Sequence, residues 1–277
     1  MSGPTHTDES EREPTEVPAL RVALGEYDTG WQEPGLSLAR ATDVVAGAAR
    51  LHARLIVLPE MCTTGFTMDA ERWAEPVDGP GPEALAALAR THGVWIVAGL
   101  ALHEEPPPRA VNAAVLFDPT GAVGSIYRKQ RLFAYGGEHE HYVAGDAPVT
   151  PTVEGVRLGL FVCYDLRFPE LFRAVAPDID AAIVIANWPE RRRAHWDVLT
   201  RARAIENQCY LVAVNRTGLG GDTTYDGGSV AFDPWGESVG IGMPRVVDID
   251  PARVHRVRSR YPFLRDLELT REAPLRL

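Results

Sequence analysis

Three cysteines give the chain three candidate nucleophiles, which only the local sequence distinguishes. Cys163 follows the nonpolar run 159–162, which predicts a buried strand, and a helix is expected to begin soon after it, near Arg167. A thiol placed beside a helix N-terminus or a cation ionises more easily and can attack a carbonyl. Cys209 begins a later strand and fits an inert core residue. Cys62 has no strand-to-helix turn after it but stays an alternative.

Two charged residues at other strand ends could assist such a nucleophile. Glu60 follows the apolar run 55–58 directly, and the carboxyl edge of a sheet commonly hosts ligands. Lys129 lies in the basic run 127–131 at the end of another expected strand, where alternation points it away from its neighbours. Taken singly, Glu60 could cap a helix and Lys129 could belong to a solvated basic edge. Together, a thiol, a base and a cation suit the hydrolysis of an amide.

Strands and helices that would position these residues alternate along the chain. Apolar runs predict strands at 20–26, 55–58, 94–100, 110–117, 123–128, 156–162, 181–186 and 210–215, and short ones near 228–232, 238–241 and 246–249. Helical spacing predicts helices at 36–51, 80–92 and 192–207. Continuous apolar strands indicate sheets covered on both faces, and a hairpin turning at 119–121 indicates mixed sheets. The pattern predicts a layered α/β sandwich, without distinguishing one sheet from two.

Composition narrows the possible partners and compartment. A net charge of -10 gives no electrostatic attraction to nucleic acid or to anionic membranes. Apolar runs such as 55–58 are far shorter than the roughly 20 residues that span a bilayer. The odd cysteine count, without a CxxC pair, fits a reducing compartment. We therefore expect a cytoplasmic protein with neither nucleic-acid nor membrane partners.

The N-terminal segment differs in composition from the rest of the chain. Residues 1–17 are rich in Ser, Thr, Glu and Pro and lack the apolar stretch of a signal peptide. They are predicted to form a disordered tail. Residues 18–277 contain no repeat or internal linker and are predicted to form one catalytic domain.

The chain resembles the nitrilase, or carbon-nitrogen hydrolase, superfamily through motifs that match its Glu-Lys-Cys triad in order and spacing. These motifs are Leu-Pro-Glu60, Tyr-Arg-Lys129 and Val-Cys163-Tyr-Asp-Leu-Arg-Phe-Pro-Glu. The resemblance continues through Ala186-Asn-Trp-Pro189 and Asp226-Gly-Gly-Ser229. The segments 60–66, 137–142 and 187–191 look most like the ω-amidase branch, while Cys62 departs from the aromatic or aliphatic residue common there.

This resemblance implies a fold, an assembly and an activity. The implied fold is a four-layer αββα sandwich with two mixed central sheets, and the implied assembly is a homodimer. No metal or organic cofactor is implied. The expected reaction is cleavage of the terminal carboxamide of a small 2-oxo acid amide, 2-oxoglutaramate or 2-oxosuccinamate, to carboxylate and ammonia through a thioester.

The resemblance also assigns the site residues. Glu60 is implied as general base, Lys129 as oxyanion donor and Cys163 as nucleophile, with a second glutamate at Glu138 or, alternatively, Glu140. The backbone N–H of Tyr164 is expected to be a further oxyanion donor. Arginine suits a substrate carboxylate; the candidates are Arg167 and the cluster 191–193, represented by Arg191, although Arg167 could instead pair with Glu170. Trp188 could line the pocket or belong to the hydrophobic core.

Related activities would use the same three residues. A nitrilase, an N-carbamoyl amidase and a deaminated-glutathione amidase are the near alternatives. A glutaminase module is disfavoured because no second catalytic domain or phosphate-binding glycine-rich loop follows. A noncatalytic binding protein on the same scaffold is a different class, and the intact set of three residues argues against it.

Overall fold

The computed structural model describes residues 17–104 and 109–266. The expected N-terminal tail, 1–17, therefore lies outside the described residues except for Val17, as does the 267–277 end of the expected catalytic domain. In the described part, two six-stranded sheets form the centre of the molecule. The sequence pattern could not distinguish one sheet from two, and the structure has two.

The first sheet collects strands from the N-terminal half of the chain and one from near its end. Its order is β14-β1-β2-β3-β4-β5, in which β1, β2 and β3 are parallel and the other neighbours are antiparallel. The strands are β1 Leu20–Leu24, β2 Leu55–Val57, β3 Trp95–Glu104, β4 Arg109–Phe117, β5 Val123–Arg128 and β14 Arg245–Ile249. The expected hairpin is present as β4 and β5.

The second sheet repeats this plan with later strands. Its order is β13-β12-β9-β8-β7-β6, with β7, β8 and β9 parallel and antiparallel strands on both sides. The strands are β6 Thr152–Val153, β7 Val156–Val162, β8 Ala181–Ala186, β9 Tyr210–Asn215, β12 Val230–Phe232 and β13 Ser238–Val239. A separate hairpin joins β10, Thr217–Gly220, to β11, Thr223–Asp226.

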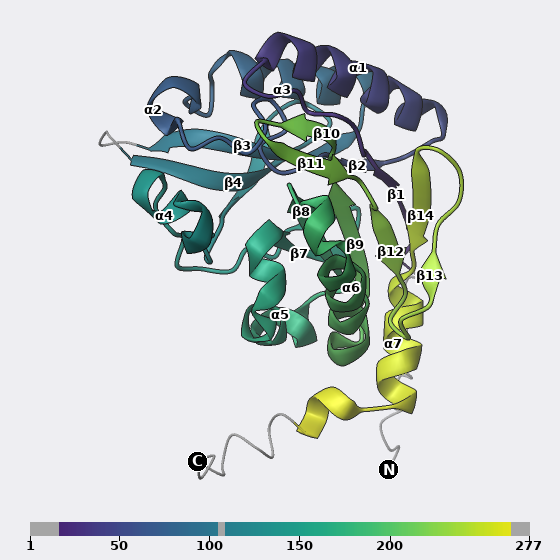
Figure 1. Ribbon diagram of the computed structural model, residues 1–277. Helices are drawn as coiled ribbons and strands as arrows, with labels where there is room; N and C mark the ends of the chain where they lie inside the picture. The colour runs from purple at the N-terminus through teal and green to yellow at the C-terminus, as the bar shows by residue number, and fades with distance from the viewer. Residues whose placement is uncertain (1–16, 105–108, 267–277) are drawn as a thin grey trace, which may run out of the picture.

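Helices cover the outer face of each sheet, which makes four layers. The longer helices are α1 Pro34–Arg50, α3 Pro80–His92, α5 Pro169–Val175, α6 Arg193–Asn207 and α7 Pro251–Arg260, and the short ones are α2 Ala70–Trp73 and α4 Glu138–His141. In Figure 1, α1 and α3 lie on one side of the sheets and α5 and α6 on the other. One apolar cluster fills the space between the sheets, a second lies under α1 and α3, and a third under α5 and α6. This arrangement confirms the expected αββα sandwich.

The structure also contains β6, the β10–β11 hairpin and the helices α2, α4 and α7, none of which had a counterpart in the sequence prediction. The β10–β11 hairpin contains three glycines in and around its turn and too few apolar residues for a strand pattern. Helix α7 buries only Pro251 and Val254, so its apolar stripe is too narrow to be recognised by periodicity. Its start did carry a signal, because Asp250 caps it by accepting a hydrogen bond from the Ala252 N–H and proline follows the cap. β6 is only two residues long.

The parallel strands bring distant chain segments to common edges. β2 ends three residues before Glu60, and β7 ends directly before Cys163. β7 and β8 pair in parallel with Val162 opposite Ile185, so the residues following both strands lie near each other. The carboxyl edge of such strands is the usual place for a ligand site in α/β folds.

Candidate active site

Cys163 lies on a sharp turn between β7 and a 3₁₀ helix, Cys163–Arg167. Its φ is +46°, a left-handed conformation that is unfavourable for a residue with a side chain and that clusters at functional sites. Its Sγ atom lies 3.8 Å from the main-chain oxygen of Asn187. The turn therefore places the thiol just beyond the end of β7 and beside the residue that follows β8.

Asp165 stabilises this turn through hydrogen bonds. Its buried carboxylate accepts hydrogen bonds from the Val162 N–H at 2.9 Å, the Arg131 N–H at 2.9 Å and the Tyr127 hydroxyl at 2.8 Å. Burial raises the pKa of Asp165 to about 6. The strained backbone of Cys163 is thus tied to both sheets, since Tyr127 belongs to β5 and Val162 to β7.

Glu60, Lys129 and Glu138 form a fully buried charge cluster. The Lys129 Nζ lies 2.9 Å from Glu60 Oε1 and 2.9 Å from Glu138 Oε2. The Asn112 side-chain amide donates to Glu60 Oε1 at 2.7 Å and to Glu138 Oε1 at 2.8 Å. One ammonium and one amide therefore bind two carboxylates together, as buried charges require.

The two candidate second glutamates lie in different environments. Glu138 begins α4 and is completely buried, and its Oε2 also accepts the Phe133 N–H at 2.6 Å. Glu140 lies on the exposed face of α4. The structure thus brings Glu138, and not Glu140, to Lys129.

The charge cluster sets the protonation states around the thiol. Burial works against ionisation of Glu60, but the attraction of Lys129 and hydrogen bonds from Lys129, Asn112 and the Asn187 N–H lower its pKa. For Lys129, burial is outweighed by the two carboxylates, and its pKa is raised. Burial, and next the negative charge of Glu60, raise the pKa of Cys163 well above its ordinary value. The raised pKa favours a neutral thiol in the resting site, so attack requires a base.

The other two cysteines lie in the hydrophobic interior. Cys62 packs with the cluster beneath α1 and α3, and burial raises its pKa to about 12. Cys209 packs beneath α5 and α6, where burial likewise raises its pKa to about 12. Of the three thiols, only Cys163 lines the cavity described next.

A cavity of about 170 Å³ opens beside Cys163 and Lys129. Its wall combines aromatic rings with cations and includes Phe66, Phe133, Tyr164, Arg167, Asn187, Trp188, Arg191, Arg192, Thr223 and Tyr225. Trp188 is 2% exposed and packs against Trp196, so it belongs both to the wall and to the core. Within the described ranges, no Asp or Glu side chain is among the wall residues.

The candidate carboxylate-binding arginines differ in their contacts. Arg167 stacks over the Trp188 ring at 4.8 Å, and its Nη2 lies 3.1 Å from His195 Nδ1. Glu170 lies near Arg131 instead, at 3.7 Å, which leaves Arg167 facing the cavity. Arg193 forms ion pairs with Asp197 and Asp226 and does not line the cavity. Arg167, Arg191 and Arg192 therefore remain as candidates.

Two asparagines are site residues that sequence reasoning did not single out. Asn112 lies inside the apolar run of β4, where a lone buried amide was the available signal. Asn187 follows β8, donates from its main chain to Glu60 Oε2 at 2.8 Å and from its side chain to the Glu60 main-chain oxygen at 2.7 Å. It was noticed only as part of a motif. Both residues hold Glu60 in place.

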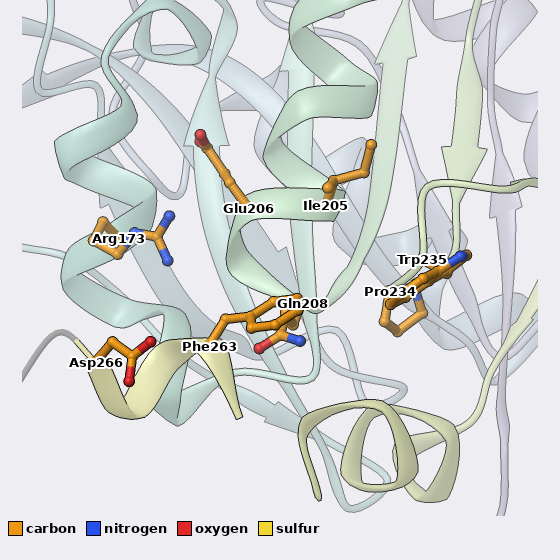
Figure 2. A pocket seen from close by; sticks show the side chains of 8 residues that line it. All are labelled: Arg173, Ile205, Glu206, Gln208, Pro234, Trp235, Phe263 and Asp266. Atoms are coloured by element: carbon orange, nitrogen blue, oxygen red, sulfur yellow. The ribbon is translucent and has the colours of Figure 1, made fainter. Parts of the chain in front are cut away.

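A second hollow, of about 460 Å³, contains none of the expected catalytic residues. Figure 2 shows it beside the C-terminal end of α6, between Trp235, Phe263 and Arg173. Across residues 17–104 and 109–266, no cluster of three His, Cys, Asp or Glu side chains is arranged to hold a metal ion. Over the same ranges, no helix has the length and apolar character needed to cross a bilayer.

Two stacked mixed sheets covered by helices, with a thiol beside a buried carboxylate–ammonium cluster, are the features expected of a hydrolase of the nitrilase type. The carbon-nitrogen hydrolase family profile matches residues 21–255. Omega-amidase YafV from Escherichia coli is 34% identical over 258 residues, which cover 91% of this chain and 98% of that protein. The 2-oxoglutaramate amidase of Bacillus subtilis is 33% identical over 89% of this chain and 96% of its own. The chain belongs to the carbon-nitrogen hydrolase family and is a hydrolase of carbon–nitrogen bonds in amides, most similar to the ω-amidase branch.

Solved structures agree with this placement. XC1258 from Xanthomonas campestris, a CN-hydrolase superfamily protein with an arsenic adduct in its active site, has a TM-score of 0.83 at 33% identity and covers 90% of this chain and 97% of its own. A mutant amidase from Nesterenkonia sp. AN1 carries the acetamide moiety of fluoroacetamide on its active-site cysteine. It has a TM-score of 0.78 at 29% identity, covering 95% of this chain and 100% of its own.

Proposed function

We propose that this amidase hydrolyses the terminal carboxamide of a small 2-oxo acid amide, 2-oxoglutaramate or 2-oxosuccinamate, through a thioester on Cys163. The observation that carries the proposal is the cavity itself. It places the thiol and Lys129 beside Arg167, Arg191 and Arg192, with no acidic side chain in its wall. Such a wall suits a small substrate with a carboxylate at one end and an amide at the other. The names of the similar E. coli and B. subtilis proteins support the same substrate class.

Glu60 is proposed to activate the thiol. Because the pKa of Glu60 is lowered and that of Cys163 is raised, the resting pair is carboxylate and thiol. As Sγ attacks the amide carbon, its proton passes to Glu60, which then gives it to the amide nitrogen. The C–N bond breaks, ammonia leaves, and a thioester remains. Water, deprotonated by Glu60, then attacks the thioester and releases the free acid.

Lys129 and the Tyr164 main-chain N–H are the proposed oxyanion donors. The raised pKa of Lys129 keeps it a cation throughout the cycle, so it needs no proton to stabilise the developing negative charge. Loss of one such donor costs about 2.7–4 kcal/mol of barrier in comparable sites. Glu138, whose two oxygens already accept from Asn112, Lys129 and Phe133, is proposed to orient Lys129.

A substrate panel tests this function. Ammonia release is measured from 2-oxoglutaramate, 2-oxosuccinamate, an N-carbamoyl amino acid, deaminated glutathione and a nitrile. We expect the two 2-oxo acid amides to give the highest kcat/KM. Turnover of the nitrile without turnover of any amide would point to a nitrilase, and preference for the carbamoyl compound or deaminated glutathione would point to those amidases.

The nucleophile is tested separately. Cys163→Ala is expected to abolish turnover while leaving the circular dichroism spectrum unchanged, because the side chain contributes little to the core. Cys62→Ala is the matched control, and it should retain activity. Mass spectrometry of the acyl-enzyme trapped during turnover should locate the added mass on the peptide containing Cys163. An adduct on the Cys62 peptide would reverse the assignment.

A further inference from the structure

The Tyr225 hydroxyl is a polar group of the catalytic cavity that has no hydrogen-bond partner within the described part of the chain. The residue is 6% exposed and lines the cavity beside Cys163. Its oxygen is not among the side-chain atoms that are both unpaired and closed to solvent, so it is open to the cavity. A hydroxyl that faces a cavity without a protein partner is available to a ligand.

The Tyr225 ring is held in place by a buried arginine. The guanidinium of Arg216, which is fully buried, lies 4.7 Å from the centre of this ring. Arg216 in turn donates to the Asp28 side chain and to the Leu219 main-chain oxygen, both at 2.8 Å. Thr223 lies two residues before Tyr225 in β11, so both side chains point to one face of the hairpin, and both line the cavity. The hairpin thus presents two neutral hydroxyls from a fixed position.

The Tyr225 hydroxyl also lies within electrostatic reach of the reacting groups. Burial raises the pKa of Tyr225 to about 12, an effect that Arg216 opposes. The charges of Glu60 and Cys163 raise this pKa further, while Arg192 lowers it, so these groups surround the hydroxyl oxygen. At neutral pH the hydroxyl therefore keeps its proton and can donate a hydrogen bond.

The proposed substrate has one polar group that still lacks a partner, the 2-oxo oxygen. The amide of the substrate is assigned to Cys163 and Lys129, and its carboxylate suits the arginines of the wall. The 2-oxo oxygen is a neutral acceptor, and burying it without a donor is costly. Because the 2-oxo group is bonded to the carboxylate carbon, its donor must lie near an arginine, as Tyr225 lies near Arg192.

Two further hydroxyls line the cavity, on Tyr164 and Thr223. Tyr164 is partly exposed, and its ring packs edge-on against Phe133 at 5.1 Å and Phe168 at 5.2 Å. Thr223 is also partly exposed and borders a second, more open hollow. Water competes for both hydroxyls, whereas Tyr225 is the most buried of the three, so its bond to a ligand is weakened least.

We propose that the Tyr225 hydroxyl donates to the 2-oxo oxygen and makes the site prefer 2-oxo acid amides to amides without this group. This inference rests on the proposed function and adds a specificity-determining residue to it. Tyr225 exchanges no proton with the substrate, so its contribution is to binding, and an amide without the 2-oxo group gains nothing from it.

Glutaramate, the monoamide of glutaric acid, is the matched substrate. It keeps the amide, the carboxylate and the chain length of 2-oxoglutaramate and lacks only the 2-oxo oxygen. kcat/KM is measured for both substrates in the wild type and in Tyr225→Phe, which removes one oxygen atom. The ratio of 2-oxoglutaramate to glutaramate should fall roughly tenfold, the usual effect of one hydrogen bond. Tm should stay unchanged, because the hydroxyl bonds no described residue.

Tyr142→Phe is the control for the loss of a tyrosine hydroxyl. The Tyr142 hydroxyl donates to the Thr67 main-chain oxygen at 2.8 Å, and the residue does not line the cavity. This variant should have a lower Tm and the wild-type ratio of the two substrates. An equal fall of the ratio in both variants would overturn the inference. So would a Tyr225→Phe variant that lowers the two substrates by the same factor or lowers neither.

Thr223→Val separates the two hydroxyls of the hairpin. A ratio that falls in this variant and not in Tyr225→Phe would overturn the assignment to Tyr225. The wild-type rates distinguish the inference from the proposed function beneath it. An enzyme that hydrolyses neither substrate overturns the proposed function, and the inference with it. An enzyme that hydrolyses both, and whose Tyr225→Phe variant keeps the wild-type ratio, overturns the inference alone.

Discussion

Asp165 holds the turn that carries Cys163, the proposed nucleophile. It accepts three hydrogen bonds around the strained turn, and burial raises its pKa to about 6. Glu60, by contrast, has a lowered pKa and stays ionised at that pH. The first group of the site to be protonated on acidification should therefore be Asp165, followed only later by the general base.

We predict that kcat/KM is constant above about pH 7 and falls as the pH drops through about 6. The stability of the folded state should change in the opposite direction to the activity. A raised pKa means that the folded state binds the proton more tightly than the unfolded state, so through this group acidification stabilises the fold. Activity should therefore fall in this range without unfolding, which a pH–rate profile and circular dichroism at the same pH values would establish.

Asp165→Asn is the variant that isolates this group. An amide offers one acceptor oxygen where the carboxylate offers two, so activity should be lower by roughly 10- to 100-fold at neutral pH, from the 1.5–3 kcal/mol typical of charged hydrogen bonds. Its profile should lack the limb near pH 6 and stay flat until Glu60 is protonated. An unchanged limb in this variant would assign the titration to another group.

Among the arginines, Arg167 is the one we predict to bind the substrate carboxylate most strongly. It is partly buried and held by the Trp188 ring and His195, whereas Arg191 is exposed and screened by water. Arg167→Met should raise KM for 2-oxoglutaramate by roughly 10- to 100-fold with a smaller change in kcat, and Arg191→Met should do less. Butyramide, which lacks the carboxylate, should not distinguish the variants. Arg131→Met is the control, since Arg131 lies outside the cavity wall.

Glu60, Lys129 and Cys163 could be named from the sequence because each stands at or just beyond the end of an expected strand, and a family resemblance added Glu138. Asn112 and Asn187 could not be given roles, because nothing in the sequence around either residue shows that the Glu60 carboxylate lies beside it. These contacts form because Asn112 in β4 and Asn187 after β8 both lie against Glu60, which follows β2.

At the scale of elements, Gly99 in β3 sets the distance between this strand and the Glu60 turn. A Cβ atom at position 99 would lie 2.3 Å from the Cα of Glu60 and 2.6 Å from the Met61 nitrogen. The Cys62 N–H donates to the Gly99 oxygen at 2.8 Å, so the turn cannot move away without losing this bond. The position of Glu60, the proposed base, and of its loop therefore requires glycine at position 99.

We predict that Gly99→Ala displaces Glu60 and lowers kcat by at least about 100-fold, as small misplacements of catalytic groups do. Thermal unfolding should show a lower Tm, because backbone must shift to relieve the clash. Gly47→Ala in α1 is the matched control. A Cβ there meets only the Arg50 Nη2 at 3.7 Å, so activity should be kept and Tm should rise slightly. Equal activity in both variants would show that the Glu60 turn adapts.

The β10–β11 hairpin is the element whose absence from the sequence prediction matters most for function. It supplies Thr223 and Tyr225 to the cavity wall. It is fixed by Arg216, which is fully buried, pairs with Asp28 at 2.8 Å and stacks on Tyr225 at 4.7 Å. The pair of Arg216 with Asp28 joins the two halves of the chain, so local patterns did not reveal it.

At the scale of the whole molecule, the distribution of charge is uneven. The chain carries a net charge of -10, yet the charged groups of the catalytic cavity wall are all cations. Lys129 is paired with two carboxylates, while Arg167, Arg191 and Arg192 form no ion pair with a described residue. The three arginines therefore favour a small anion in the cavity even though the chain as a whole is negative.

Several exposed apolar side chains lie on or near α6, and we predict that this face is the contact of a homodimer. Val198 and Ile205 are 68% and 49% exposed and lie seven residues apart on α6, hence on one side of it. Figure 2 shows Ile205, Trp235 and Phe263 around the 460 Å³ hollow at the end of this helix. A soluble monomer rarely leaves such a patch uncovered, and a second copy is the partner that the family resemblance implies.

Light scattering coupled to size exclusion should give twice the chain mass for the wild type. Ile205→Glu should shift the protein to the monomer mass, because a buried unpaired carboxylate at an interface is strongly unfavourable. Val123→Glu, an equivalent change at an exposed apolar residue of β5, should leave the dimer intact. If both variants remain dimeric, the contact lies on another face, and a monomeric wild type would contradict the dimer itself.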